Sequence, residues 1–319
     1  MGIARTLGRP GQHRRTIDIG IKVATAPISW GACEIPGWGD LLPYERVLDE
    51  MVASGYAGTE LGPPGFLPED RDALQAALTS RDLALVGAFH PIPLHDPERR
   101  REATSAALAT ARRLAELGAP VLVLAADGDA RRDAIAGRVP ADGSASLDED
   151  GWEYACTLVD RIARNAAELG VRTAFHPHAA SYVEAPHEIE RLLVATDPTL
   201  VGLCLDTGHV GYGGGDPAAL ARAHGRRVRH VHLKDLRRKV HASAIARGVG
   251  FRDAVGEGVF APLGAGDLDL RGTLVALRDS GYDGWLVVEQ DVRLGITPGA
   301  APLEDARRSR AFVREAIGA

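Results

Sequence analysis

The stretch that decides the fold is VGLCLDTGH, residues 201–209. Val201, Leu203 and Leu205 alternate with small residues over a short apolar run, which is typical of a buried strand. The run stops at Asp206, and a carboxylate at the end of a buried strand needs a cation, hydrogen-bond donors or a ligand beside it. The stretch therefore predicts a strand that delivers an acidic group to a functional site.

Three further stretches have the same form, an apolar strand whose last residues are His, Asp, Glu or Lys. They are TAFHPH at 173–178, VRHVHLKD at 228–235 and WLVVEQD at 285–291. In a parallel barrel, the carboxyl ends of all strands meet at one rim. Four strands that deliver such side chains to one rim predict a metal site at the mouth of a barrel.

The rest of the chain alternates strand-like with helix-like segments. From residue 22 onward, eight apolar runs of strand length are separated by segments of helical character, for example 43–54, 186–195 and 270–279. Parallel strands need crossover connections as long as a helix, and eight such units in roughly 300 residues fit a barrel better than an open sheet. We therefore predict an α/β fold, a single (β/α)8 TIM barrel.

The catalytic barrel domain is expected to span 18–319, with 1–17 as a leader outside it. The leader has four arginines, no acidic residue and no apolar core of a secretory signal. Two long connections interrupt the alternation, a polar one at 128–150 and a glycine-rich one at 236–269. We expect the second to be an irregular excursion, whose glycine-rich part at 248–266 serves either as a lid over the site or only as a long connection.

The composition is that of an ordinary globular protein, with 45% hydrophobic and 25% charged residues among 319. A net charge of -6 gives no reason to propose a nucleic-acid partner. No apolar run approaches the roughly 18–20 residues that span a bilayer, so we expect no membrane partner. Cys33, Cys156 and Cys204 lie far apart, which favours a reducing compartment and predicts a cytoplasmic protein. A homo-oligomer is compatible with this composition.

Most candidate site residues lie at strand ends. They are Glu60, His90, His176, His178, Asp206, His209, His232, Lys234, Asp235 and Glu289. His176 and His178 are two residues apart and point to one face of their strand, although Pro177 can turn the second away. His230 lies deeper in its strand than His232, so we assign His230 to core packing and His232 to the rim.

Mixed carboxylate and imidazole ligands with one open position suit a catalytic divalent metal. We expect Mn²⁺ or Co²⁺, with Mg²⁺, Fe²⁺ and Zn²⁺ as alternatives. Glu289 follows two valines in the last strand, and a buried glutamate there needs a cation or an ion pair. It is therefore a candidate for the metal site.

Other residues are candidates for substrate binding, namely Glu60, His90 and Trp30. For Glu60 the alternative is pairing with an arginine, and for Trp30 it is packing within a loop. Lys234 is expected either to contact a substrate oxygen or to form a salt bridge with Asp235.

Four motifs carry a resemblance to a known family. GTELG at 58–62, CLDTGHVGYGGGD at 204–216, RHVHLKD at 229–235 and GYDGWLVVEQD at 281–291 resemble the xylose-isomerase-like TIM barrels of the sugar phosphate isomerase/epimerase superfamily. The likeness runs from about residue 22 to the end and is greatest to the inosose (2-keto-myo-inositol) dehydratase branch. The resemblance implies a divalent metal held by strands five to eight. Its implied ligands are His176, Asp206, His232 and Glu289, with His178 as the alternative to His176.

The fifth strand bears on the reaction type. Most epimerases and isomerases that this chain resembles carry Glu where it has FHPH at 175–178. An epimerase needs a base on each face of the reacting carbon, whereas a dehydratase needs one base and one acid. We therefore expect a metal-dependent dehydratase, a hydro-lyase. The resemblance implies that it acts on a keto-cyclitol or keto-sugar, so the expected partner is a small polyhydroxylated keto substrate. Glu289 is the expected base, and His178 or His209 is the expected proton donor.

Three alternatives remain at this point. The first is a ketose epimerase or aldose–ketose isomerase on the same barrel. The second is an apurinic-site endonuclease, which shares the superfamily but needs three metals and a basic groove. The third is a barrel that only binds a ligand, and the full set of strand-end ligands argues against it.

Overall fold

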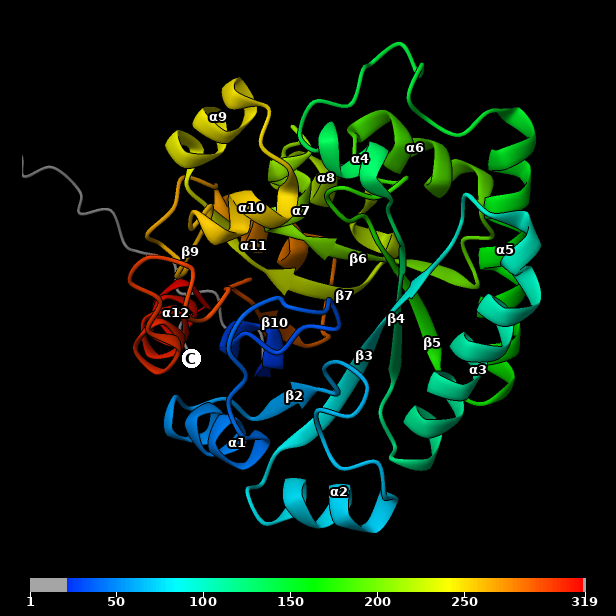
Figure 1. Cartoon of the computed structure of the whole chain (residues 1–319). Coiled ribbons are helices and arrows are strands. Elements are labelled where there is room, and N and C mark those ends of the chain that lie inside the picture. The colour runs from blue at the N-terminus through cyan, green and yellow to red at the C-terminus, as the bar shows by residue number, and fades with distance from the viewer. Residues whose placement is uncertain (1–21, 318–319) are drawn as a thin grey trace, which may run out of the picture.

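The fold is a closed barrel of eight parallel strands with helices around it (Figure 1). A computed structural model describes residues 22–317. Around the barrel the strands follow the order β1, β10, β7, β6, β5, β4, β3, β2. Their bounds are Val23–Thr25 (β1), Gly58–Glu60 (β2), Ala84–Ile92 (β3), Val121–Ala126 (β4), Arg172–His176 (β5), Val201–Asp206 (β6), Val228–Leu233 (β7) and Leu286–Val288 (β10). The predicted (β/α)8 barrel is confirmed, whereas the expected leader at 1–17 lies outside the described residues.

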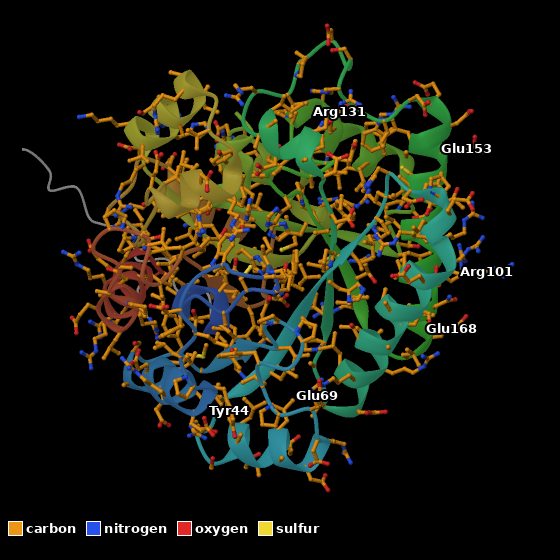
Figure 2. The ribbon with its side chains drawn as sticks, viewed as in Figure 1. Tyr44, Glu69, Arg101, Arg131, Glu153 and Glu168 are labelled. Atoms are coloured by element: carbon orange, nitrogen blue, oxygen red, sulfur yellow. The ribbon has the colours of Figure 1, made fainter. Side chains whose placement is uncertain are left out.

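The α-helices connect the strands, and most of them cover the outside of the barrel. They are Tyr44–Ala53 (α1), Arg71–Thr79 (α2), Arg100–Glu116 (α3), Ala130–Ala134 (α4), Glu149–Glu168 (α5), Pro186–Ala195 (α6), Thr207–Tyr212 (α7), Pro217–His224 (α8), Arg238–Arg247 (α9), Phe251–Gly256 (α10), Leu270–Asp279 (α11) and Pro302–Ile317 (α12). Charged side chains of the outer helices, such as Arg101 and Glu168, point away from the barrel (Figure 2). Within residues 22–317, no helix combines the length and the apolar character needed to cross a membrane.

The barrel interior is filled by small and β-branched side chains. Val121 and Val123 on β4 join Ala174 and Cys204 in a cluster of their own, whereas Leu122 on β4 belongs to the large core shared with the helices. Because neighbours on a strand point to opposite faces, the small cluster lies inside the barrel and the leucine outside it. The polar side chains at the strand ends lie above this layer.

The sequence suggested that the glycine-rich connection after β7 is irregular. The structure instead shows helices and strands in it. It contains α9, α10 and a two-stranded antiparallel sheet formed by Asp235–Leu236 (β8) and Phe260–Ala261 (β9). Asp235 anchors it, because its carboxylate accepts hydrogen bonds from the backbone N–H groups of Leu236, Gly264, Gly266 and Leu268. We call residues 237–268 the roof segment.

The roof segment is tied to the connection after β4. Asp133 in α4 accepts a hydrogen bond from the backbone N–H of Phe251, the first residue of α10 (3.0 Å). Arg138 donates a hydrogen bond to the carbonyl of Ile245 in α9 (2.9 Å). Two long connections therefore pack together near the C-terminal ends of the strands, where α4, α9 and α10 are drawn in Figure 1.

Candidate active site

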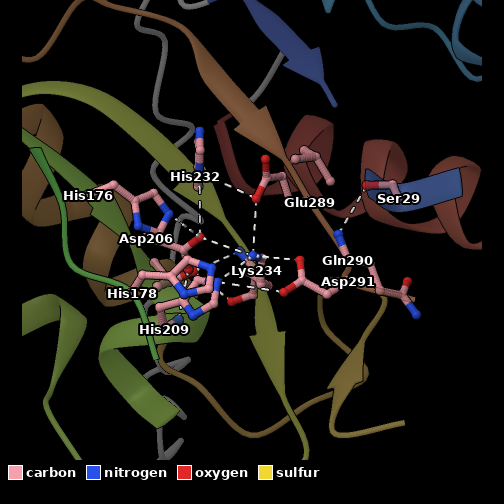
Figure 3. A network of polar contacts seen from close by, with 12 residues as sticks. Ser29, His176, His178, Asp206, His209, His232, Lys234, Glu289, Gln290 and Asp291 are labelled. Carbon is pink, nitrogen blue, oxygen red and sulfur yellow. Dashed lines mark hydrogen bonds and ion pairs between the residues drawn. The ribbon is translucent and has the colours of Figure 1, made fainter. Parts of the chain in front are cut away.

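Four strands bring their last polar residues together at one end of the barrel (Figure 3). Asp206 Oδ2 lies 3.3 Å from His176 Nε2 and 3.6 Å from His232 Nδ1. Glu289 Oε2 lies 3.3 Å from the same Nδ1 atom of His232. All four side chains are buried. The structure thus brings together the four residues that the sequence resemblance implies as metal ligands.

The donor set of this cluster fits a divalent cation. One ligand atom each from Asp206, His232 and Glu289 lies within 4.8 Å of the others. His232 Nδ1 is buried without a hydrogen-bond partner and faces the two carboxylates. Two carboxylate oxygens and imidazole nitrogens are the mixed ligands that Mn²⁺, Co²⁺, Fe²⁺ and Zn²⁺ accept. Burial raises the pKa of the nearby Cys204 thiol to about 11, so the thiol stays protonated and the carboxylates are the anionic ligands.

Lys234 occupies the centre of the acidic groups rather than pairing with Asp235. Its Nζ lies 3.3 Å from Asp206 Oδ2, 3.1 Å from Glu289 Oε2 and 2.7 Å from Asp291 Oδ1. Burial by itself lowers the pKa of Lys234, but the three carboxylates hold that pKa well above its ordinary value. The side chain is therefore an ammonium group.

Gly208 explains how the lysine side chain reaches this place. A Cβ atom at Gly208 would lie 2.6 Å from Lys234 Cγ, a distance that real Cβ contacts do not show. The glycine of the Asp-Thr-Gly-His motif is thus required by a close approach. Thr207 adds a second link, because its hydroxyl donates to the Lys234 carbonyl (2.6 Å) and accepts from the Lys234 N–H (2.8 Å).

The rings of His178 and His209 are in contact beside the ammonium group, with centroids 3.8 Å apart and planes tilted by 33°. His178 Nδ1 donates to the Ala179 carbonyl (2.8 Å), and His209 Nδ1 accepts from the Ala179 N–H (3.1 Å). Burial, with His176 and Lys234 next, lowers the pKa of His178 to about 3. Burial also lowers the pKa of His209 well below its ordinary value. Both rings are therefore neutral.

The roof segment covers these two histidines. The Phe251 ring lies 5.6 Å from the ring of His178 and 5.4 Å from that of His209. Phe260 lies 5.8 Å from His209, and both phenylalanines are buried. Of the two interpretations of the connection after β7, the structure supports a cover over the site.

The structure does not place His90 and Trp30 as the sequence suggested. His90 Nδ1 lies 3.0 Å from Thr110 Oγ1 on α3, outside the barrel, because the preceding Phe89 takes the inward position against His176. Trp30 is fully buried in the main core, where its Nε1–H donates to Glu50 (2.7 Å). The structure therefore does not bring these two side chains together with the other candidate residues.

Glu60 pairs with two histidines rather than with an arginine. Its Oε1 lies 2.7 Å from His230 Nε2 and 2.9 Å from His232 Nε2. Burial alone raises the pKa of Glu60, but His232 and His230 lower it below its usual range. The carboxylate is ionised beneath the candidate metal centre.

Asp291 is a site residue that the sequence analysis did not single out. It contacts Lys234, and its Oδ2 lies 3.6 Å from His209 Nε2. The sequence could have identified Asp291 as a site residue. It lies two positions after Glu289, and such residues point to the same face of an extended segment.

A parallel (β/α)8 barrel with buried His, Asp and Glu side chains at its strand ends defines a class of metal-dependent barrel proteins. The chain belongs to the xylose isomerase-like TIM barrel family, whose family model matches residues 48–316.

Similar proteins cover most of the chain. It is 39% identical to the rhizopine catabolism protein MocC of Rhizobium meliloti, over 85% of this chain and 82% of that protein. It is 33% identical to the inosose dehydratase of Geobacillus thermodenitrificans strain NG80-2, over 93% of this chain and 98% of that protein. Among solved structures, the IOLI protein with a bound zinc atom has a TM-score of 0.68 at 16% identity, covering 93% of this chain and 98% of that one. The structural likeness concerns the fold alone.

Proposed function

We propose that the protein is a divalent-metal-dependent hydro-lyase that removes water from an inosose-type keto-cyclitol. The observation that carries this proposal is the asymmetry of the site, in which the Glu289 carboxylate faces imidazoles and an ammonium group rather than a second glutamate on β5. Curated relatives between 30% and 34% identical over most of the chain are named inosose dehydratase, which supports the same activity.

His176, Asp206, His232 and Glu289 are the proposed metal ligands. His176 is preferred over His178, because His176 Nε2 points at Asp206 whereas His178 is held by the Ala179 carbonyl. We propose Mn²⁺ or Co²⁺, which accept mixed nitrogen and oxygen ligands. A divalent ion held by these residues would polarise the substrate ketone and make its α-proton more acidic.

The residues of the chain then supply an acid and a base. Glu289 is the proposed base, because burial raises the pKa of its carboxyl group and favours proton uptake. The proposed donor to the leaving hydroxyl is the cluster of Lys234, His178 and His209. The rings are neutral, so the Lys234 ammonium group holds the acidic proton, and its Nζ lies 3.0 Å from His209 Nε2. The α-proton goes to Glu289, the C–O bond to the β-hydroxyl breaks, and that hydroxyl leaves as water after it takes a proton from the cluster.

We place the enzyme in the cytoplasm. Cys33, Cys156 and Cys204 are all free thiols in the structure, which fits a reducing compartment.

The proposal is tested by incubating the metal-loaded protein with 2-keto-myo-inositol in deuterated solvent and following the reaction by NMR and ultraviolet absorbance. We expect loss of water and an unsaturated or rearranged diketone. Glu289→Gln should slow the reaction about 10²–10⁴-fold. Glu304→Gln on the exposed face of α12 is the matched control and should react at the normal rate. Recovery of an epimer or an isomeric sugar without loss of water would instead identify an epimerase or isomerase.

A further inference from the structure

The Glu60 side chain reaches across the barrel interior. It starts on β2, and the histidines that it contacts lie on β7, although β1 and β10 separate these two strands. The interior layer at β1 and β10 is made of Ala24, Ala26 and Val287. These small side chains leave room for a glutamate to pass beneath the candidate metal centre.

The contacts of Glu60 are hydrogen bonds rather than shared coordination of an ion. Two ligands of one tetrahedral ion, each roughly 2.1 Å from it, lie roughly 3.4 Å apart. The distances from Glu60 Oε1 to the two Nε2 atoms are 2.7 and 2.9 Å, which are hydrogen-bond lengths. A carboxyl oxygen that lies at hydrogen-bond distance from two ring nitrogens at once acts as the acceptor for both, so each Nε2 atom carries the proton.

This arrangement fixes which nitrogen of His232 faces the carboxylates above it. Because Nε2 carries a proton and points down to Glu60, Nδ1 points up to Asp206 Oδ2 at 3.6 Å and Glu289 Oε2 at 3.3 Å. In the neutral ring with Nε2–H, the lone pair is on Nδ1. Nδ1 is also the buried ring atom without a hydrogen-bond partner.

We propose that Glu60 is a positioning residue, which selects the Nε2–H tautomer of His232 and so presents Nδ1 to the divalent ion. The inference rests on the ligand role proposed for His232 and not on the dehydration reaction. Histidine ligands commonly donate their second N–H to a carboxylate, and loss of that partner weakens metal binding by about 10–100-fold. His230 is a second donor, which holds the same oxygen from the deeper end of β7.

The test uses zinc alone, because zinc is diamagnetic and needs no substrate. Zinc affinity is measured by competition with a chelator, and the ring protons of His232 are observed by NMR in protein labelled with ¹⁵N-histidine. The variants are Glu60→Ala, Glu60→Gln and His230→Phe. Glu50→Gln is the matched control, since Glu50 also accepts a hydrogen bond from an aromatic ring N–H but lies outside the site.

We expect the zinc-loaded protein to show a slowly exchanging proton on His232 Nε2. Glu60→Ala should lose that signal and bind zinc about 10–100-fold more weakly. The zinc affinity of Glu60→Gln should lie between that of Glu60→Ala and that of the unaltered protein, because the glutamine amide oxygen still accepts a hydrogen bond. His230→Phe should keep the His232 signal and lose less affinity than Glu60→Ala.

Unchanged zinc affinity or an unchanged His232 signal in Glu60→Ala would overturn the proposal. So would an equal loss in Glu60→Ala and His230→Phe, because packing of the cluster would then explain the effect. Both measurements are made without substrate, so a failure to dehydrate 2-keto-myo-inositol bears on the proposed function alone.

Discussion

Lys234 Nζ lies 2.7 Å from Asp291 Oδ1, closer than it lies to either carboxylate that we propose as a metal ligand. Asp291 therefore offers the ammonium group a counter-charge that is separate from the ligand set. When Asp206 and Glu289 coordinate a cation, Lys234 keeps a buried ionic partner. Such a partner is needed, because an unpaired buried charge costs several kcal/mol.

Replacement of Asp206 by Asn should release the metal while the barrel stays folded. Asp206 also caps α7 by accepting the His209 N–H (2.8 Å), and Asn keeps that acceptor while it removes the charge. We expect a large loss of bound metal by elemental analysis with an unchanged circular dichroism spectrum. Asp216→Asn, which alters the N-cap of α8 outside the site, should retain the metal. Full metal content in Asp206→Asn would show that the ligand assignment is wrong.

Replacement of Lys234 by Met should lower the melting temperature of the metal-free protein. The change leaves three buried carboxylates without their ammonium partner, which costs several kcal/mol. Added Mn²⁺ or Zn²⁺ should then raise the melting temperature more than it does in the unaltered protein, because the ion restores positive charge. Lys239→Met, at an exposed position in α9, is the control and should melt normally. If metal-free Lys234→Met and metal-free Lys239→Met melted at the same temperature, this account would be contradicted.

Replacement of Gly208 by Ala should destabilise the protein by about 1–3 kcal/mol, the usual cost of overpacking. The new Cβ would meet the side chain of Lys234. Denaturant unfolding of Gly208→Ala, Lys234→Ala and the double variant forms a double-mutant cycle. The penalty of the alanine should become smaller once the lysine is truncated, because Cγ and Cδ are removed while the Cβ of residue 234 stays 2.7 Å from the new Cβ. A penalty that is the same in both backgrounds would locate the strain elsewhere.

Stability should fall as the pH rises from about 4.5 to about 7, owing to Glu184. Burial raises the pKa of this carboxyl group to about 7, against the opposing effect of hydrogen bonds from the N–H groups of Gly137 and Ala180. A group whose pKa is raised on folding binds more protons in the folded state than in the unfolded state. Its contribution to the free energy of unfolding is therefore full below pH 4.5 and is lost as the pH rises to about 7. The shift corresponds to about 3 kcal/mol.

The measurement is urea unfolding of the unaltered protein and Glu184→Gln at pH 5 and pH 8. Gln does not titrate, so the pH dependence of the free energy of unfolding should be smaller in the variant. Equal pH dependence in both proteins would show that Glu184 does not titrate in this range.

The sequence predicts the barrel well because each apolar run is followed by a periodic helix. The bounds of α6 and α11 agree with the sequence, since Pro186 and Asp269 mark their starts. Helix α7 was missed, because its two glycines and short length resemble a turn. The structure brings together the proposed ligands because parallel strands end at one rim.

The misplaced residues have physical explanations. At the end of β3, Phe89 points into the barrel. His90 is the next residue on the strand, so its side chain points outward to the helices. The partners of Glu60 lie about 170 residues away on β7, and no local pattern shows that a side chain crosses a barrel. The helices of the roof segment are short, and α9 buries only Ala244, so its sequence shows little helical periodicity.

Lys234 and Asp235 are neighbours in the chain, but they serve different parts of the structure. Lys234 points into the site, whereas the Asp235 carboxylate holds the base of the roof segment through four backbone N–H groups. A loop that is closed at its base tolerates changes of length, since each doubling costs only about 0.6 kcal/mol of closure entropy. The roof segment can therefore vary in length while the proposed ligands on the strands keep their places, provided that its contacts with Asp133 and Arg138 are kept.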